Sequence, residues 1–314
     1  MGSESSSEGS PGSPIVVGID FSSCARSALW QAVRMAQWRE GTALHVVHVI
    51  ESLVASELAK ALPGSDEEVV QQIVEHAEKE LDSWISEMPI DVQRHVVIGT
   101  PIGEIVQLVR AVGAGLLVVG AWGVAGPGRG AGTLATKCVR KVPAPVLLVN
   151  EAHTDRFARV VAGVDFSDLC RVAVEQAIEV AVQDEAHLDL LHVFRGPWHK
   201  LHYRAPTPEA LPDFRRQYEA ALRSHLEQFL DEFADATHEV VEGQIGCCLL
   251  DRTDSGRGIA EFARDKAVDL VVLGTRGHTN LRYVFLGTTA ERVLREAPCS
   301  VLTIKPSEFV LPGE

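Results

Sequence analysis

The segment from 274 to 288 contains the residues of this chain whose types and spacing are best suited to bind a ligand. It reads GTRGHTNLRYVFLGT and directly follows a short apolar run. Glycines at 274, 277 and 287 permit positive φ angles and let backbone N–H groups approach a ligand without interference from a Cβ atom. A helix expected to begin near Thr288 would add its own N–H groups, forming an anion-binding site that suits a polyphosphate.

Charged side chains and two other apolar runs point to the same place. Arg276, His278 and Arg282 add positive charge within the segment, Asp165 ends one apolar run, and Val193 ends the next. In open parallel sheets the carboxyl ends of the strands share one edge, where helix N-termini collect and ligands bind. We therefore expect these residues to meet at that edge.

The elements that must position these residues are written twice in the chain. The stretch 15–37 aligns with 160–182 at an offset of 145, and GAWG at 120–123 aligns with GTRG at 274–277. A short join lies at about 151–157. The repeat predicts a disordered tail over 1–14, a first domain over 15–150 and a second domain over 157–307.

Apolar runs that alternate with amphipathic stretches indicate parallel sheets covered by helices on both faces. The predicted fold class is α/β, with two tandem open parallel-sheet sandwiches of about five strands each, Rossmann-like in their winding. In the second half the strands are expected at 159–164, 188–193, 238–242, 269–273 and 300–304, and the helices near 168–183, 213–234, 258–267 and 288–296.

Composition excludes several classes of partner. The chain has 314 residues, 46% of them hydrophobic and 23% charged, and a net charge of -14. That charge disfavours nucleic acid and anionic lipid surfaces as primary partners. The uncharged run 111–128 is interrupted by glycines and a proline, which favours a strand and loop over a membrane span. Free cysteines and a polar tail lead us to expect a cytoplasmic protein.

The spacing Gly274-x2-Gly277-x9-Gly287-Thr288, between an apolar strand and a helix, resembles the ATP-binding signature of the universal stress protein family. Asp165 and the second strand ending in LLHV match that family as well. The resemblance extends from 15 to 306 as two copies. It implies an adenine-nucleotide alpha hydrolase-like fold and a stress-linked ATP binder that is not an efficient enzyme.

The resemblance also implies a role for each matching position. Asp165 would lie beside the adenosine, and Val193 would offer backbone groups to the adenine. The ribose and phosphates would be contacted by Leu273, Gly274, Gly277, Gly287, Thr288 and Thr289, with Arg276 and His278 adding charge. Members of the family often carry a divalent ion such as Mg²⁺ on the phosphates, although no acidic cluster in this sequence independently predicts one.

The first half departs from the signature. Its matching positions are Asp20, Val49, Gly120, Gly123, Gly132 and Thr133, but eight residues rather than nine separate the second and third glycines. Pro127 removes an N–H donor from that loop, and Arg129 is the loop's charged residue. Whether this half binds ATP stays open.

Several alternatives remain beside the ATP-binding regulator. The chain could be a nucleotide-free scaffold that recognises a protein partner, and PVLLVN and SVLTIK could pair as edge strands within the chain, as a pseudo-dimer, or in a homodimer. Slow ATP hydrolysis is possible, but no Walker lysine or catalytic set is visible. The aspartates could equally cap helices, and His48 and His192 could be structural. The segment after Gly243, with Cys247 and Cys248, could be a lid, a solvated excursion or a redox site.

Overall fold

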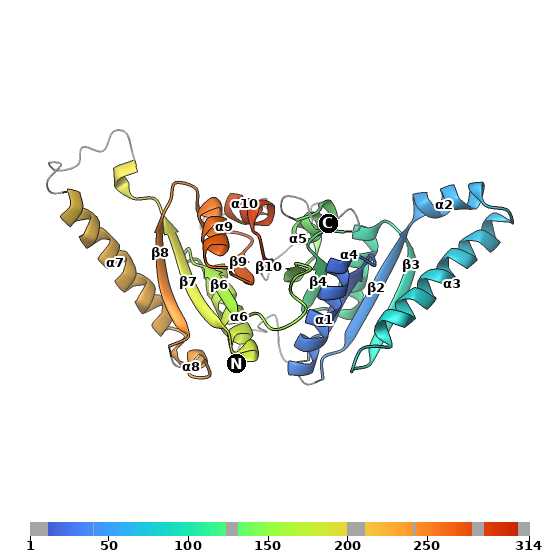
Figure 1. The fold of residues 1–314 in the computed structure, drawn as a ribbon, viewed down its shortest axis with the longest axis horizontal. Coiled ribbons are helices and arrows are strands. Elements are labelled where there is room, and N and C mark those ends of the chain that lie inside the picture. The colour runs from blue at the N-terminus through green and yellow to red at the C-terminus, as the bar shows by residue number, and fades with distance from the viewer. Residues whose placement is uncertain are drawn as a thin grey trace, which may run out of the picture. The chain divides into compact units, whose positions relative to one another are not determined.

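The computed structural model describes residues 12–39, 41–123, 131–199, 211–240, 243–277 and 286–306. These residues form two compact units that divide between Asp155 and Arg156 (Figure 1). Each unit contains a five-stranded parallel sheet. This arrangement confirms the predicted α/β class with two tandem parallel sheets.

The first unit alternates strands and helices, and its sheet has the order β3-β2-β1-β4-β5. Its elements are β1 (Ile15–Ile19), α1 (Ser23–Trp38), β2 (Leu44–Glu51), α2 (Ser52–Ala61), α3 (Asp66–Ile85), β3 (Val92–Gly99), α4 (Pro101–Val112), β4 (Leu116–Gly120), α5 (Thr133–Lys141) and β5 (Val146–Val149).

The second unit repeats this plan, with the sheet order β10-β9-β6-β7-β8. Its elements are β6 (Arg159–Gly163), α6 (Asp168–Asp184), β7 (His187–Phe194), the 3₁₀ turn η1 (Pro197–His199), α7 (Leu211–Asp231), α8 (Ala234–Thr237), β8 (Ile245–Asp251), α9 (Ser255–Asp265), β9 (Leu270–Gly274), α10 (Thr288–Glu296) and β10 (Ser300–Ile304).

Helices cover both faces of the second sheet. Ala162 of β6 pairs with Val272 of β9, so Gly163 and Leu273 share a face of the sheet, and Gly163 faces Ile259 of α9. Successive residues of a strand point to opposite faces. Gly274 therefore lies on the other face, where a Cβ atom would approach Leu169 of α6. Burial on both faces explains why the strands are apolar throughout.

The predicted third strand of the second half is wrong. It was expected at 238–242, but the strand is β8, and Ile245 to Asp251 pair in register with β7. β8 is an edge strand that is half-buried along its whole length. Glycine, cysteine and leucine serve such a position without the β-branched run that signals a central strand. Half of the supposed insertion at 244–257 is therefore strand, and its last residues begin α9.

No helix among the described residues has both the length and the apolar character that crossing a bilayer requires.

Candidate functional site

A cavity of about 180 Å³ lies at the carboxyl edge of the second sheet. It is enclosed by the ends of β6, β7 and β9 and by the first turns of α9 and α10. Nine of the predicted residues line it: Asp165, Val193, Leu273, Gly274, Arg276, Gly277, Gly287, Thr288 and Thr289. His278, also predicted, lies outside the described residues.

Gly277 is a glycine because of its contact with Asp165. A Cβ atom on Gly277 would lie 2.5 Å from Oδ2 of Asp165, closer than van der Waals packing allows. Gly274, Gly277 and Gly287 do not adopt the positive φ that glycine permits. The sequence signal marked close approach of the backbone, and not a left-handed turn.

Asp165 orients the serine that caps the start of α6. Its Oδ1 accepts hydrogen bonds from Ser167 N at 3.0 Å and from Ser167 Oγ at 2.6 Å. Ser167 is the N-cap, and its Oγ accepts from Cys170 N at 3.3 Å. The aspartate is thus not the cap itself but orients the cap, while Oδ2 faces the glycine loop.

Phe166, between these two residues, has a left-handed backbone with φ 63°. This conformation is unusual for a residue with a large side chain and persists only where the surroundings hold it. The ring packs against His192 and His225 at centroid distances of 4.8 and 4.2 Å and against Phe229 at 5.4 Å. Sequence reasoning missed this residue, although its equivalent Phe21, with φ 59°, repeats in the first unit.

His192 has a structural hydrogen bond. Its Nδ1 donates to the carbonyl oxygen of Val164 at 2.8 Å and so ties β7 to the end of β6. Burial lowers the pKa of His192, which keeps the ring neutral. His48 forms the same bond to Ile19 O at 2.9 Å. The structural interpretation of both histidines accounts for this geometry, although His192 also lines the cavity.

Thr275 is a polar residue of the cavity that sequence reasoning did not identify. Its side chain is fully buried, and Oγ1 has no hydrogen-bond partner among the described residues. A buried hydroxyl without a partner is costly. Thr275 lines the cavity, so a ligand is in a position to supply the missing partner. Nothing in the repeat marked this residue, because its equivalent in the first unit is Ala121.

The first turn of α10 supplies the main-chain donors. Gly287, its N-cap, provides no side-chain cap, and the N–H groups of the first helical residues have no acceptor within the helix. The amide of Gly287 itself donates to Thr275 O at 2.7 Å. Gly287 therefore shapes the loop, and the donors available to an anion are those of Thr288, Thr289 and Ala290.

Ser255 begins α9 and brings a second helix N-terminus to the cavity. Figure 1 shows α9 and α10 side by side, and they approach so closely that a Cβ atom on Gly256 would lie 2.7 Å from Thr289 O. Sequence reasoning missed Ser255 because it assigned this stretch to an insertion. Two helix dipoles therefore favour negative charge at the same cavity.

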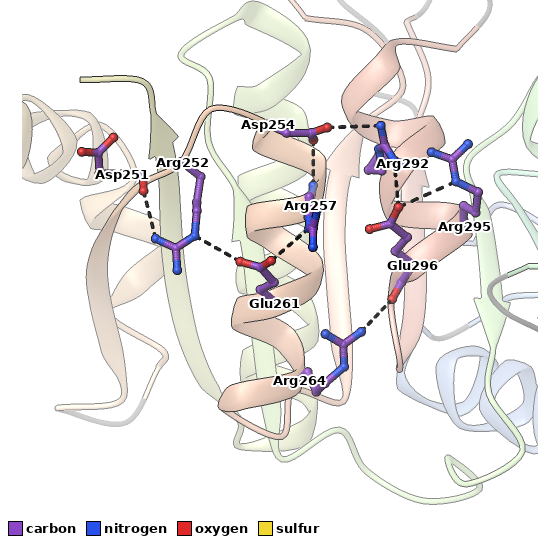
Figure 2. Close-up of polar contacts among 9 residues, drawn as sticks. All are labelled: Asp251, Arg252, Asp254, Arg257, Glu261, Arg264, Arg292, Arg295 and Glu296. Carbon is purple, nitrogen blue, oxygen red and sulfur yellow. Dashed lines mark hydrogen bonds and ion pairs between the residues drawn. The ribbon is translucent and has the colours of Figure 1, made fainter. Parts of the chain in front are cut away.

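Ion pairs join these two helices on their outer side (Figure 2). Arg292 of α10 pairs with the α9 N-cap Asp254 at 3.3 Å and with Glu296 at 2.9 Å. The carboxylate of Glu261 on α9 forms ion pairs with Arg252 and Arg257, each at 3.1 Å. The side chains are partly exposed, so each pair contributes modestly. The pair between Arg292 and Asp254 and the hydrogen bond from Arg264 to Glu296 O, at 3.5 Å, are the contacts among these that join α9 to α10.

The first unit has a second cavity, of about 320 Å³, at the corresponding edge. All of its predicted residues line it: Asp20, Val49, Gly120, Gly123, Gly132 and Thr133. A Cβ atom on Gly123 would lie 2.6 Å from Asp20 Oδ2, and Ser22 N and Oγ donate to Asp20 Oδ1 at 3.1 and 2.5 Å. Pro127 and Arg129 lie outside the described residues. The loop geometry around the carboxylate is thus the same in both units.

Neither a metal cluster nor a redox pair is apparent in the described part of the chain. No three His, Cys, Asp or Glu side chains there converge to hold an ion. Cys247 and Cys248 are free, and as neighbours on β8 they point to opposite faces. Burial, with Asp189 nearby, raises the pKa of Cys248 to about 11, which leaves an unreactive thiol.

Comparison with known proteins gives a consistent result. The model of the universal stress protein family matches residues 13–150 and 156–305. Universal stress protein Rv1996 of Mycobacterium tuberculosis is 26% identical over 328 aligned positions, covering 95% of this chain and 97% of that protein. Universal stress protein MJ0531 of Methanocaldococcus jannaschii is 28% identical over 151 residues, which is 48% of this chain and 82% of that protein.

A solved structure shares the fold over nearly the whole length. The crystal structure of a universal stress protein from Archaeoglobus fulgidus superposes with a TM-score of 0.61 at 18% identity, covering 93% of this chain and 98% of that one. At that identity the likeness concerns the fold and not the ligand. The chemistry of the two cavities has to be argued from the residues that line them.

Proposed function

The chain belongs to the universal stress protein family as a tandem pair of domains, and from that premise we propose that it is an ATP-binding regulator whose second domain holds the nucleotide. The observation that carries the proposal is Thr275, a fully buried hydroxyl without a partner on a cavity lined by the predicted glycines. Two helix N-termini and Arg276 favour an anion at the same cavity.

The residues present fit such a ligand. The N–H groups of Thr288, Thr289 and Ala290 would hold phosphate oxygens, with Arg276 and Ser255 beside them. The missing Cβ at Gly277 lets Asp165 Oδ2 lie against the main chain of the loop, and both residues line the cavity. The adenine would lie toward Val193 and Leu273. A divalent ion such as Mg²⁺ would be bound mainly by the phosphates, since the described residues provide no acidic cluster for it.

Nucleotide occupancy would act as the signal. The loop that carries Gly277 leads into α10, and α10 is joined to α9 by the contact at Gly256 and by Arg292. A ligand that binds one arrangement of these elements more tightly shifts the population toward it. A protein partner would then distinguish the occupied from the empty form. We propose binding as the main activity, with any hydrolysis of ATP slow.

The proposal is tested by identifying what the purified protein carries. The full chain, denatured after purification, should release an adenine nucleotide, and the emptied protein should show a rise in Tm when ATP is added, because ligands that bind the native state stabilise it. Absence of both a released nucleotide and a thermal shift with ATP, ADP or AMP would reject the function.

A further inference from the structure

The two cavities share one half and differ in the other. The shared half contains the aspartate and its facing glycine, the valine at the end of the second strand, and the neighbouring histidine: Asp20, Gly123, Val49 and His48 in the first unit, and Asp165, Gly277, Val193 and His192 in the second. The differing half is the one that would contact phosphates.

In that half, polar residues of the second cavity are replaced by apolar residues in the first. Ala121 stands in place of Thr275, Trp122 in place of Arg276 and Leu134 in place of Thr289. The first residue of the helix after the third strand is Pro101 in the first unit and Ser255 in the second. Proline lacks the N–H group that this position would offer. Together these changes remove two hydroxyl groups, one positive charge and one main-chain N–H group, while the N–H groups at the start of α5 are kept.

The charge of the first cavity is also less favourable to phosphate than that of the second. Glu51 lines the first cavity, together with Asp20. By strand register Glu51 corresponds to Arg195, because Leu44 and Leu188 occupy equivalent positions beside β1 and β6. Arg195 does not line the second cavity, where the lining arginine is Arg276. Among the described residues that line the first cavity there is no lysine or arginine. Two carboxylates with no lysine or arginine among the described lining residues disfavour a polyphosphate.

The first cavity nevertheless retains features of a ligand site. Its volume is about 320 Å³ against about 180 Å³ in the second. Trp122 lines it, and the indole Nε1 is buried without a hydrogen-bond partner among the described residues. A buried indole N–H usually has an acceptor. The missing acceptor would come from an uncharged ligand with an apolar body.

We propose that the first domain binds an uncharged nucleoside and discriminates against nucleotide polyphosphates. The base would lie against the apolar lining with an acceptor toward Trp122 Nε1, and the sugar hydroxyls would donate to Asp20 and Glu51. The choice of a nucleoside rests on the proposed function, because the shared half of the cavity is the half assigned there to adenosine. The rejection of phosphate rests on the first cavity alone.

Calorimetry of the full chain tests this with adenosine as the probe. With the second site saturated by ATP, adenosine should still bind at one equivalent per chain. Trp122→Phe, which keeps the ring and removes the N–H, should weaken adenosine about tenfold and leave ATP unchanged. Trp38→Phe is the matched control, since Trp38 is 51% exposed at the end of α1, and should change neither.

A gain-of-binding variant guards against loss through misfolding. Trp122→Arg with Leu134→Thr gives the first cavity two of the polar residues of the second, and should add a second equivalent of ATP. Two equivalents of ATP in the unaltered protein, or adenosine binding that Trp122→Phe leaves unchanged, would overturn the inference. Adenosine binding at the first site without any ATP binding would support this inference and reject the proposed function. ATP binding without adenosine binding would support the proposed function and overturn this inference.

Discussion

Thr275 combines complete burial with an unpartnered hydroxyl at the wall of the second cavity. Its replacement by the isosteric valine should therefore have two opposite effects. Thr275→Val should raise the free energy of unfolding of the empty protein by about 1 kcal/mol, because a costly buried group is removed. The same change should weaken ATP about tenfold, because the ligand loses a hydrogen bond.

A second buried hydroxyl provides the control. Thr42 Oγ1 is also buried without a partner in the described structure, but Thr42 does not line either cavity. Thr42→Val should therefore increase stability without affecting ATP. Urea unfolding and ATP titration of both variants make the comparison, and an unchanged ATP affinity in Thr275→Val would exclude Thr275 from the site.

Gly277 is the glycine whose replacement should have the largest effect. A Cβ atom at this position would meet Asp165 Oδ2 at 2.5 Å, so Gly277→Ala must displace the carboxylate from Ser167 or shift the loop. We expect a loss of about 1 to 3 kcal/mol of stability and more than tenfold weaker ATP binding.

Gly132→Ala is the matched change, because its Cβ atom would meet Ala121 O at an ordinary 3.5 Å in the other unit. It should leave ATP binding and stability nearly unchanged. If Gly277→Ala bound ATP as tightly as the unaltered chain, the close approach of Gly277 to Asp165 would not matter for the ligand.

At the level of elements, the loss of Arg292 should loosen the contact between α9 and α10. Its side chain is 37% exposed and pairs with the α9 N-cap Asp254 and with Glu296 of α10. Arg292→Ala should lower stability by less than about 1 kcal/mol. The loss should shrink at high salt, because salt screens exposed pairs. ATP affinity should fall a few-fold, since both helix N-termini line the cavity.

Arg295→Ala is the comparison for this prediction. Arg295 is 53% exposed and lies 3.8 Å from Glu296, without contact to α9 in the ion pairs of Figure 2. It should leave the ATP affinity unchanged. Equal effects of the two variants on ATP binding would show that the pair between Arg292 and Asp254 does not position the site.

Strands β2 and β3 carry a pair of histidines that should make the first unit sensitive to acid. His45 Nδ1 lies 3.1 Å from His95 Nε2. Burial lowers the pKa of both residues, and the neighbouring ring lowers that of His45 further. Just below about pH 6.5, both side chains are still neutral in the folded protein, whereas in the unfolded chain they already bind protons. Stability should therefore be full above about pH 6.5 and fall as the pH decreases below it.

Replacement of both histidines by glutamine should reduce this dependence. Thermal unfolding of the double variant and of the unaltered chain, at pH 7.5 and pH 5.5, measures it. The double variant should keep part of the dependence of stability on pH, because burial also lowers the pKa of His192. A slope between the two pH values that is identical in both proteins would contradict the assignment.

For the molecule as a whole, internal repetition made much of the structure predictable. The offset between the halves predicted equivalent sites at the carboxyl ends of the strands in each unit. The predicted site residues within the described part of the chain line the two cavities. β8 was missed because an edge strand needs no β-branched run. The sequence indicated that Gly277 allows either a positive φ or close approach, and the structure shows close approach, to Asp165.

Other features of the site depend on contacts that no local pattern encodes. Phe166 keeps a left-handed backbone because His192, His225 and Phe229 surround its ring. Thr275 is notable only because its hydroxyl finds no partner after the chain has folded. Both facts involve residues far apart in the sequence, so they required the structure.

The central claim is that the second domain binds ATP, and calorimetric titration of the full chain with ATP tests it most directly. We predict one equivalent of ATP per chain, with an affinity more than tenfold weaker in Gly277→Ala and unchanged in Gly132→Ala. No heat of binding in the nucleotide-free protein, or an unchanged affinity in Gly277→Ala, would contradict the claim.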